Sequence, residues 1–250
     1  MRRFFLALGL GLALAGPVAA LDLGNMTPAE KSAFDAEVRS YLLAHPEVLV
    51  EAIKSLDARQ AQQQAQSDAE MVKANATALF KDAHAWVGGN PQGDVTLVEF
   101  MDYRCTYCRH AYQEVNNLVK TDGHIRFVVK EFPILGPQSD LSARYAIAVL
   151  QAKGPEAYAK VHDALMTFRG EITQQSLAVL SKKLGLDVTD IFGRMNSDAV
   201  TTIINENRAL ADKLQIQGTP TFVLADQMLR GYLPEAAMKQ IVAKARAAKG

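Results

Sequence analysis

The sequence predicts an α/β protein in which a few buried strands are combined with a larger number of helices. Short runs rich in β-branched and aromatic residues occur at 95–100, 125–129 and 221–224, and each has the length of a buried strand. Between the second and third runs, residues 137–214 carry apolar side chains at helical spacing. The segment before residue 84 consists almost wholly of helix-favouring residues.

Glycine and proline mark the ends of the helical stretches. Gly154, Pro155 and Gly185 interrupt the apolar pattern where a helix would have to stop. We therefore expect helices at 109–120, 142–152, 156–168, 174–184, 199–214 and 234–248, with a hairpin strand at 228–232.

The first twenty residues have the pattern of a secretory signal peptide. Arg2 and Arg3 precede an apolar run over 4–15, and small residues up to Ala20 follow it. The run is too short to cross about 30 Å of hydrocarbon, which disfavours the alternative of a membrane anchor. We expect cleavage after Ala20 and export to the periplasm.

Charge and composition exclude some classes of partner. The chain has 27 basic and 27 acidic residues, and removal of Arg2 and Arg3 leaves 25 basic residues. This near-neutral balance gives no reason to expect nucleic acid as a partner. Half of the composition is hydrophobic, which is enough for one large domain or one domain with an appendage.

The two cysteines of the chain, Cys105 and Cys108, are three positions apart. A disulfide between them closes too short a loop to constrain the unfolded chain much, so its value should be chemical. The pair follows the strand at 95–100 and opens the helix at 109–120. Unpaired N–H groups at a helix N-terminus stabilise a thiolate, which is the species that attacks disulfides.

This position assigns different roles to the two cysteines. We expect Cys105, first in the turn, to be exposed and to attack the substrate. Cys108, one turn further on, should be partly buried and should resolve the mixed disulfide. Arg104 and Arg109 flank the pair and either strengthen the effect or are simply solvated.

Other uses of the pair remain open on the residues alone. With His110 the cysteines could offer three zinc ligands, but no second Cys/His cluster supplies a fourth, so we expect no metal site. Two inert core cysteines would not favour the start of a helix. A soft dithiolate could instead bind copper(I) in a stress or chaperone protein.

Three segments carry a resemblance to a known family. Residues 98–108, which read VEFMDYRCTYC, resemble the active-site segment of DsbA-type thioredoxin-fold proteins. Residues 130–136 resemble the family's loop after the second strand, and residues 217–222 resemble its cis-proline loop. The resemblance runs from about residue 85 to the C-terminus. It implies a thioredoxin fold over 85–250 with a helical insertion at about 137–214.

The resemblance also implies roles for individual residues. Pro220 would be cis and face the cysteines, with Thr219 pairing with an extended substrate. Glu99 would lie beneath the resolving cysteine and exchange its proton, although its side chain could instead reach water from a sheet edge. Thr106 and Tyr107, between the cysteines, would also contact the substrate. The redox-active disulfide itself would be the only cofactor.

Two features leave the redox direction open. No histidine occurs between the cysteines, whereas strongly oxidising DsbA proteins have one. Thr219 before the proline is more similar to disulfide-isomerase and Scs-type relatives than to the main oxidase.

The segment 21–84 divides into an apolar part and a polar part. A narrow apolar stripe runs from Phe34 to Leu56, whereas residues 57–70 contain no large apolar side chain and should bury nothing. Scs-type relatives have similar N-terminal helices that join two or three catalytic domains. We therefore expect a homo-oligomer, with docking of the helix on its own domain as the alternative.

Together these observations predict a periplasmic thiol-disulfide oxidoreductase, with an oligomeric isomerase favoured over a monomeric disulfide-donating oxidase. A copper(I)-binding protein is the alternative of another class. The expected partners are exported proteins that contain cysteine and a membrane redox protein that resets the active site.

Overall fold

The computed structural model describes residues 24–248, so the predicted signal peptide lies outside the described residues. The chain divides into two compact units, with the boundary between Arg59 and Gln60. The helix that contains this boundary, α2 (Glu47–Ala74), is continuous. Among the described residues, no helix is both long enough and apolar enough to cross a membrane.

The first unit consists of α1 (Pro28–Ala44) and the beginning of α2. Thr27 caps α1: its hydroxyl accepts from the Glu30 N–H, and its own N–H donates to the Glu30 carboxylate at 2.8 Å. The large apolar side chains of this unit face solvent. They account for eight of the twelve exposed large hydrophobic residues in the described chain: Phe34, Val38, Tyr41, Leu43, Leu49, Val50, Ile53 and Leu56.

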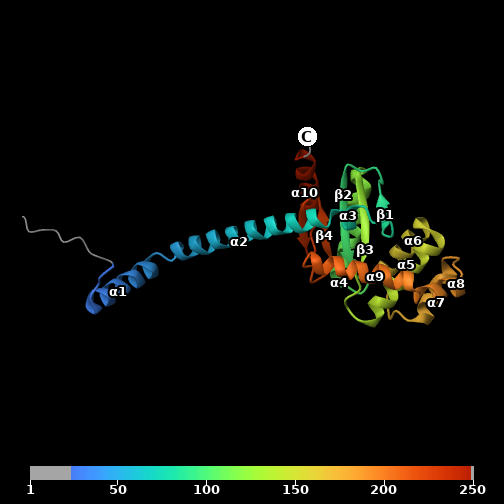
Figure 1. The fold of residues 1–250 in the computed structure, drawn as a ribbon, viewed down its shortest axis with the longest axis horizontal. Coiled ribbons are helices and arrows are strands. Elements are labelled where there is room, and N and C mark those ends of the chain that lie inside the picture. Colours follow the sequence, from blue (N-terminus) through green and yellow to red (C-terminus); the bar gives the residue numbers. More distant parts are fainter. Residues whose placement is uncertain (1–23, 249–250) are drawn as a thin grey trace, which may run out of the picture. The chain divides into compact units, whose positions relative to one another are not determined.

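The second unit is built on a five-stranded mixed sheet with the order β1-β3-β2-β4-β5 (Figure 1). The central strand β2 (Val95–Met101) runs parallel to β3 (Ile125–Glu131). The outer strands, all antiparallel to their neighbours, are β1 (Trp86–Gly89), β4 (Thr221–Leu224) and β5 (Gln227–Arg230). The three strands predicted at 95–100, 125–129 and 221–224 are therefore present, and β1 was not predicted.

Both faces of the sheet are covered by helices. On one face, α4 (Thr106–Asp122) and α10 (Glu235–Ala247) pack over alternate residues of β2, among them Leu97 and Met101. On the other face, Val98 and Phe100 pack with the end of α2, with α3 (Ala76–Phe80) and with α9 (Asp198–Lys213). This alternation of side chains across β2 produces two cores, one on each side of the sheet.

A helical insertion lies between β3 and β4. It contains α5 (Pro137–Lys153), α6 (Pro155–Thr167), α7 (Gln174–Lys183), α8 (Val188–Met195) and α9. Helix α5 is its centre, because α6, α8 and α9 all pack against it. Helices α5 to α8 gather beside the β1 edge of the sheet, where α6 contacts β1 (Figure 1). The short helix α8 was not predicted.

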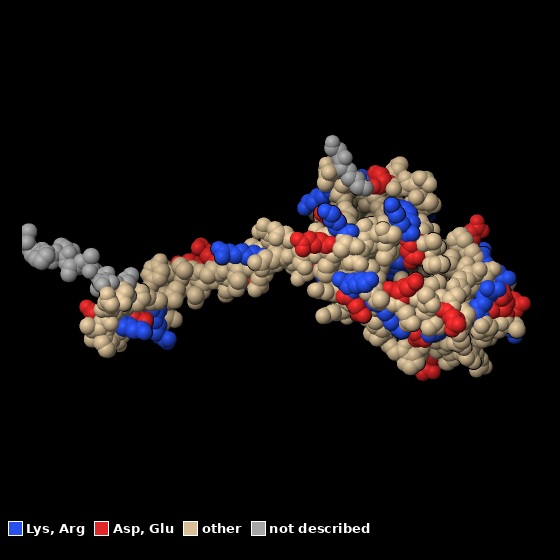
Figure 2. Space-filling model, viewed as in Figure 1, with Lys and Arg blue, Asp and Glu red and all other residues tan. Residues whose placement is uncertain are grey.

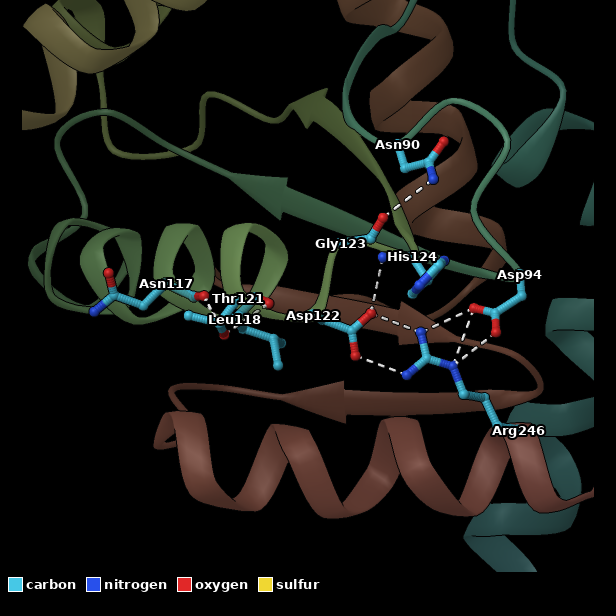
Figure 3. A network of polar contacts seen from close by, with 9 residues as sticks. All are labelled: Asn90, Asp94, Asn117, Leu118, Thr121, Asp122, Gly123, His124 and Arg246. Carbon is cyan, nitrogen blue, oxygen red and sulfur yellow. Dashed lines mark hydrogen bonds and ion pairs between the residues drawn. The ribbon is translucent and has the colours of Figure 1, made fainter.

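The C-terminal end of α4 is stabilised by the ion pairs of one arginine (Figure 3). Arg246 of α10 donates to both carboxylate oxygens of Asp122 at 2.6 and 2.7 Å, and its other side donates to Asp94 at 2.8 to 3.0 Å. Gly123 ends α4 with φ = 72°, a left-handed conformation that glycine adopts without steric cost. The strand, the helix end and the C-terminal helix are thus joined at this corner.

The polar part of α2 makes one buried contact that the sequence reading did not anticipate. Asp68 is only 4% exposed, and its two oxygens accept from the guanidinium of Arg230 at 2.5 and 2.9 Å. Val72, one turn later, lies in the core between α2 and the sheet. The expectation that residues 57–70 bury nothing was wrong at Asp68, because an ion pair replaces apolar contact there.

Charges of both signs are interspersed over the face of this unit that Figure 2 draws. No extended region of a single sign is visible on that face.

Candidate active site

Cys105 is the N-cap residue of α4. Its sulfur accepts a hydrogen bond from the Cys108 N–H at 3.5 Å, the place that a serine or aspartate oxygen takes in most helices. The two cysteines are reduced in this structure and form no disulfide with each other. Because the cap atom receives the unpaired N–H groups of the helix, a negative charge on Cys105 Sγ is stabilised by the position alone.

The two thiols have opposite acidities. The hydrogen bond from the Cys108 thiol, with backbone N–H groups of the first turn, lowers the pKa of Cys105 to about 5. Burial raises the pKa of Cys108 far above its usual range, and the hydrogen bond to Cys105 and the charge of Glu99 act in the same direction. At neutral pH, Cys105 is a thiolate and Cys108 is a thiol.

Cys105 is less accessible than the sequence suggested. Its exposed fraction is 6%, and Cys108 is fully buried. The carbonyl oxygen of Thr219 lies 3.2 Å from Cys105 Sγ and covers one side of the sulfur. The prediction that Cys105 is exposed was therefore wrong in degree, because a loop distant in the sequence lies against it.

The loop that covers Cys105 contains a cis peptide bond between Thr219 and Pro220, as the resemblance implied. Two hydrogen bonds hold the loop: Thr221 Oγ1 donates to the Gly218 carbonyl at 2.8 Å, and the Gly231 N–H donates to the Pro220 carbonyl at 2.9 Å. Pro220 is buried and Thr219 is half-buried.

Glu99 lies inside the protein on the central strand and does not reach water from an edge. It is 2% exposed, and its Oε1 atom has no hydrogen-bond partner in the part of the chain that the structure describes. Burial, followed by the nearby charges of Cys105 and Glu131, raises its pKa to about 8. A carboxyl group with this pKa can hold or release a proton at neutral pH, close to the buried thiol of Cys108.

A second buried acid, Glu131, was not predicted. It accepts hydrogen bonds from the hydroxyl groups of Tyr103 and Tyr158 at 2.8 and 2.5 Å. Tyr103 also contacts Nδ1 of His162 at 3.0 Å, and burial lowers the pKa of that imidazole to about 4. Burial raises the pKa of Glu131 to about 8. The signal was available in the sequence, because Glu131, like Glu99, ends or interrupts an apolar strand.

The structure also assigns a positioning role to Asp102, which the sequence reading did not single out. Its carboxylate accepts from the Arg104 N–H at 2.7 Å, and from the N–H groups of Ile134 and Leu135 at 2.9 and 3.1 Å. The turn before Cys105 is thereby tied to the loop after β3, so the residues that resemble the family in these two segments lie together.

Two of the remaining predicted residues lie in the first turn of α4, directly after Cys105. Thr106 is exposed and Tyr107 is 64% exposed. His110 does not join the cysteines; its ring packs against that of Tyr232, with 4.9 Å between the centroids. Over residues 24–248, no group of three or more His, Cys, Asp or Glu side chains is placed to hold a metal ion.

Comparison with known proteins shows the family to which the chain belongs. The model of a thioredoxin family matches residues 81–244, which is well over half of the chain. The chain belongs to the thioredoxin family. A second model, the N-terminal domain of the copper resistance protein ScsC, matches residues 30–63. The fold is thus a thioredoxin fold with a helical insertion, preceded by ScsC-like helices, as the sequence predicted.

Solved structures with a thioredoxin fold are similar to this chain. A thioredoxin-like oxidoreductase from Silicibacter pomeroyi is 41% identical, with a TM-score of 0.64, over 68% of this chain and 97% of that one. BcfH from Salmonella enterica Typhimurium is 27% identical, with a TM-score of 0.72, over 87% of this chain and 96% of that one. The second match therefore reaches well into the N-terminal segment.

Curated relatives of this thioredoxin-family chain are matched over smaller shares. The Na(+)/H(+) antiporter NhaA 1 of Salinispora arenicola is 30% identical over 54% of this chain, which spans only 21% of that protein. The probable disulfide bond formation protein D of Bacillus cereus is 26% identical over 53% of this chain and 66% of its own length. The chain thus spans only about a fifth of the antiporter and two thirds of the disulfide bond formation protein.

Proposed function

We propose that this protein rearranges disulfides in exported proteins as an oligomeric isomerase of the bacterial periplasm. The observation that carries the chemistry is the division of acidity between a thiolate at Cys105 and a buried thiol at Cys108, beneath which lies Glu99. The observation that favours an oligomer is the row of exposed apolar side chains in the first unit.

Isomerisation requires no net electron transfer. The Cys105 thiolate attacks one sulfur of a client disulfide; a mixed disulfide forms, the client bond breaks, and the second client sulfur leaves as a thiolate. That thiolate attacks another disulfide of the client, and a client thiolate finally releases Cys105. We assign Thr219, Pro220, Thr106 and Tyr107 to client binding. Thr219 lies against the reactive sulfur and precedes Pro220, and Thr106 and Tyr107 are exposed in the helical turn that follows Cys105.

Release by Cys108 is the alternative exit from the mixed disulfide. The Cys108 proton passes to Glu99, the Cys108 sulfur attacks Cys105, and the client leaves with two more electrons. A membrane dithiol protein must then reduce the Cys105–Cys108 disulfide. The thiolate charge of Cys105 helps to raise the pKa of Glu99. Because that charge disappears in the mixed disulfide, the pKa of Glu99 falls, so a larger fraction of the carboxyl group is ionised and able to accept the proton of Cys108.

This step is tested with Glu99→Gln, which keeps the shape of the side chain and removes the base. We expect the mixed disulfide to decay by Cys108 attack roughly a hundredfold more slowly at pH 7. Acid quenching and mass spectrometry of the trapped species measure the decay. Glu156→Gln, at an exposed position in the first turn of α6, is the matched control and should leave the rate unchanged.

Copper(I) binding by both sulfurs is less favoured as a function. A dithiolate site needs both cysteines deprotonated, and burial holds the Cys108 thiol protonated. Stoichiometric copper(I) that survives excess glutathione, without exchange activity, would overturn our proposal.

The oligomer is tested by refolding a scrambled multi-disulfide client with reduced protein at equal active-site concentration. Deletion of residues 21–59 ends at the unit boundary and keeps Asp68 and Val72, which pack on the catalytic unit. We expect this deletion to lose isomerase activity and to sediment as a monomer.

A point variant separates association from truncation. Ile53→Glu places a charge in the exposed apolar row and should dissociate the oligomer, whereas Gln63→Glu, at an exposed polar position of the same helix, should not. If the deleted protein instead oxidises reduced clients as well as the full chain does, and neither isomerises, the protein is a monomeric oxidase.

A further inference from the structure

A cavity of about 410 Å³ lies beside the reactive cysteine and is lined by cationic side chains. Arg104 and Thr106, the two neighbours of Cys105 in the chain, form part of its wall. Arg109 of α4 and Arg169, in the loop after α6, complete a group of three guanidinium ions. The cavity is large enough for a ligand of tripeptide size.

Among the described residues, the three arginines have no anionic partner. Within residues 24–248, no ion pair involves Arg104, Arg109 or Arg169, and no acidic residue lines the cavity. Asp163, the acidic residue of α6 that is nearest in sequence to Arg169, accepts a hydrogen bond from the Tyr112 hydroxyl. Burial and then the charges of Arg169 and Arg104 lower the pKa of Arg109, so the three cations interact with one another.

Two of the guanidinium groups are held in place. Arg104 Nη1 donates to the Gly170 carbonyl at 3.0 Å, and Arg109 Nη2 donates to the Phe168 carbonyl. Each bond fixes one edge of a planar group on the loop that carries Arg169. An arginine guanidinium group that has free N–H donors binds a carboxylate through two parallel hydrogen bonds. The cations are therefore arranged in advance for an anion.

We propose that this arginine pocket is a subsite for carboxylates that the thiol or disulfide substrate carries close to its reacting sulfur. This inference rests on the proposed thiol-disulfide exchange, because only an exchange substrate must bring its sulfur to Cys105. An extended chain advances about 3.5 Å per residue, so a carboxylate one to three residues from the cysteine reaches the pocket. Both an acidic client segment and glutathione have this chemistry.

The test compares single-turnover reduction of small disulfides by the reduced full-length protein, in which the Cys105 and Cys108 thiols supply the two electrons. One arm uses disulfide-linked peptides with Glu, Gln or Lys two residues from the cysteine. The other arm compares glutathione disulfide with neutral hydroxyethyl disulfide. We expect the Glu peptide to react about tenfold faster than the Lys peptide, and salt to reduce this ratio.

Arg169→Glu is the decisive variant, because Arg169 is exposed and makes no hydrogen bond that the fold needs. It should reverse the preference between the Glu and Lys peptides. Lys244→Gln, on the exposed side of the last turn of α10, changes the net charge at a distance and should keep it. The potential of the cysteine pair, measured in each variant, separates substrate recognition from a changed thiolate.

The outcomes separate the two proposals. A preference confined to glutathione disulfide assigns the pocket to that small molecule, and one confined to peptides assigns it to clients. Equal rates for all substrates, or a preference that survives Arg169→Glu, would overturn the subsite and leave the exchange activity standing. Absence of exchange with every disulfide would overturn the proposed function itself.

Discussion

The two ends of helix α4 are both polar, but they are built for different purposes. At the C-terminal end, Arg246 is saturated by Asp94 and Asp122, and Gly123 closes the helix. At the N-terminal end, the cap is the sulfur of Cys105, and the neighbouring arginines form no ion pair with a carboxylate of residues 24–248. The paired charges at the C-terminal end stabilise the fold, whereas the unpaired positive charges at the N-terminal end can interact with a reacting group. One helix thus separates stability from reactivity along its length.

The largest difference should appear in alkylation. Cys105, with a pKa of about 5, should react with iodoacetamide with a midpoint near pH 5, while Cys108 stays unreactive in the folded protein. Because an ordinary thiol is only about 1% ionised at pH 7, the rate at Cys105 at pH 7 should exceed that of the unfolded chain by roughly a hundredfold. Mass spectrometry of timed samples checks this, and equal labelling of both cysteines would contradict the assignment.

Protein stability should follow the same thiolate. The pKa of Cys105 is lowered from 9 to about 5 on folding, so the unfolded chain binds more protons between these values and stability from the thiolate is gained as pH rises. It is lost again as pH falls through 5. The reduced protein should gain on the order of 5 kcal/mol over the oxidised protein between pH 5 and 9. Urea unfolding of both forms measures the difference, and the Cys105→Ser variant should show no gain in stability from a thiolate between pH 5 and 9.

At the C-terminal end of α4, substitution of Arg246 should lower protein stability and leave the rate of disulfide exchange unchanged. Arg246→Gln removes the cation that Asp94 and Asp122 share, and we expect a modest loss in the free energy of unfolding, because the ion pairs are largely open to solvent. The pKa of Asp122 and that of Asp94 are both held low by this arginine, so the loss should shrink below pH 4 as the carboxyl groups become protonated. A changed rate of disulfide exchange would break the division between the two ends.

The smallest effect should come from Gly123→Ala. No atom lies within 4 Å of the added Cβ, so only the left-handed backbone conformation is unfavourable. We expect a loss of about 1 kcal/mol and an unchanged Cys105 pKa. Chemical denaturation measures the loss of stability, and pH-dependent alkylation measures the pKa of Cys105. Gly185→Ala, at the end of another helix with open space around it, provides the matched comparison.

Local chemistry determined much of this protein from the sequence. The strand at 95–101, the helix that opens at Cys105 and the turn at Pro220 are each encoded by residues adjacent in the chain, so periodicity, capping and motif resemblance could find them. The same reasoning placed a titratable acid at Glu99. It did not find β1, whose four residues include two glycines and carry little strand signal.

Only the tertiary structure decided how these local pieces act on one another. The burial of Cys105 depends on Thr219, more than a hundred residues away, and the second buried acid acquires its neighbours from α6 and the turn before α4. The arginine pocket combines α4 with the loop after α6. Composition and spacing contain no information on such distances, because electrostatic and burial effects depend on which groups the fold brings within a few ångströms.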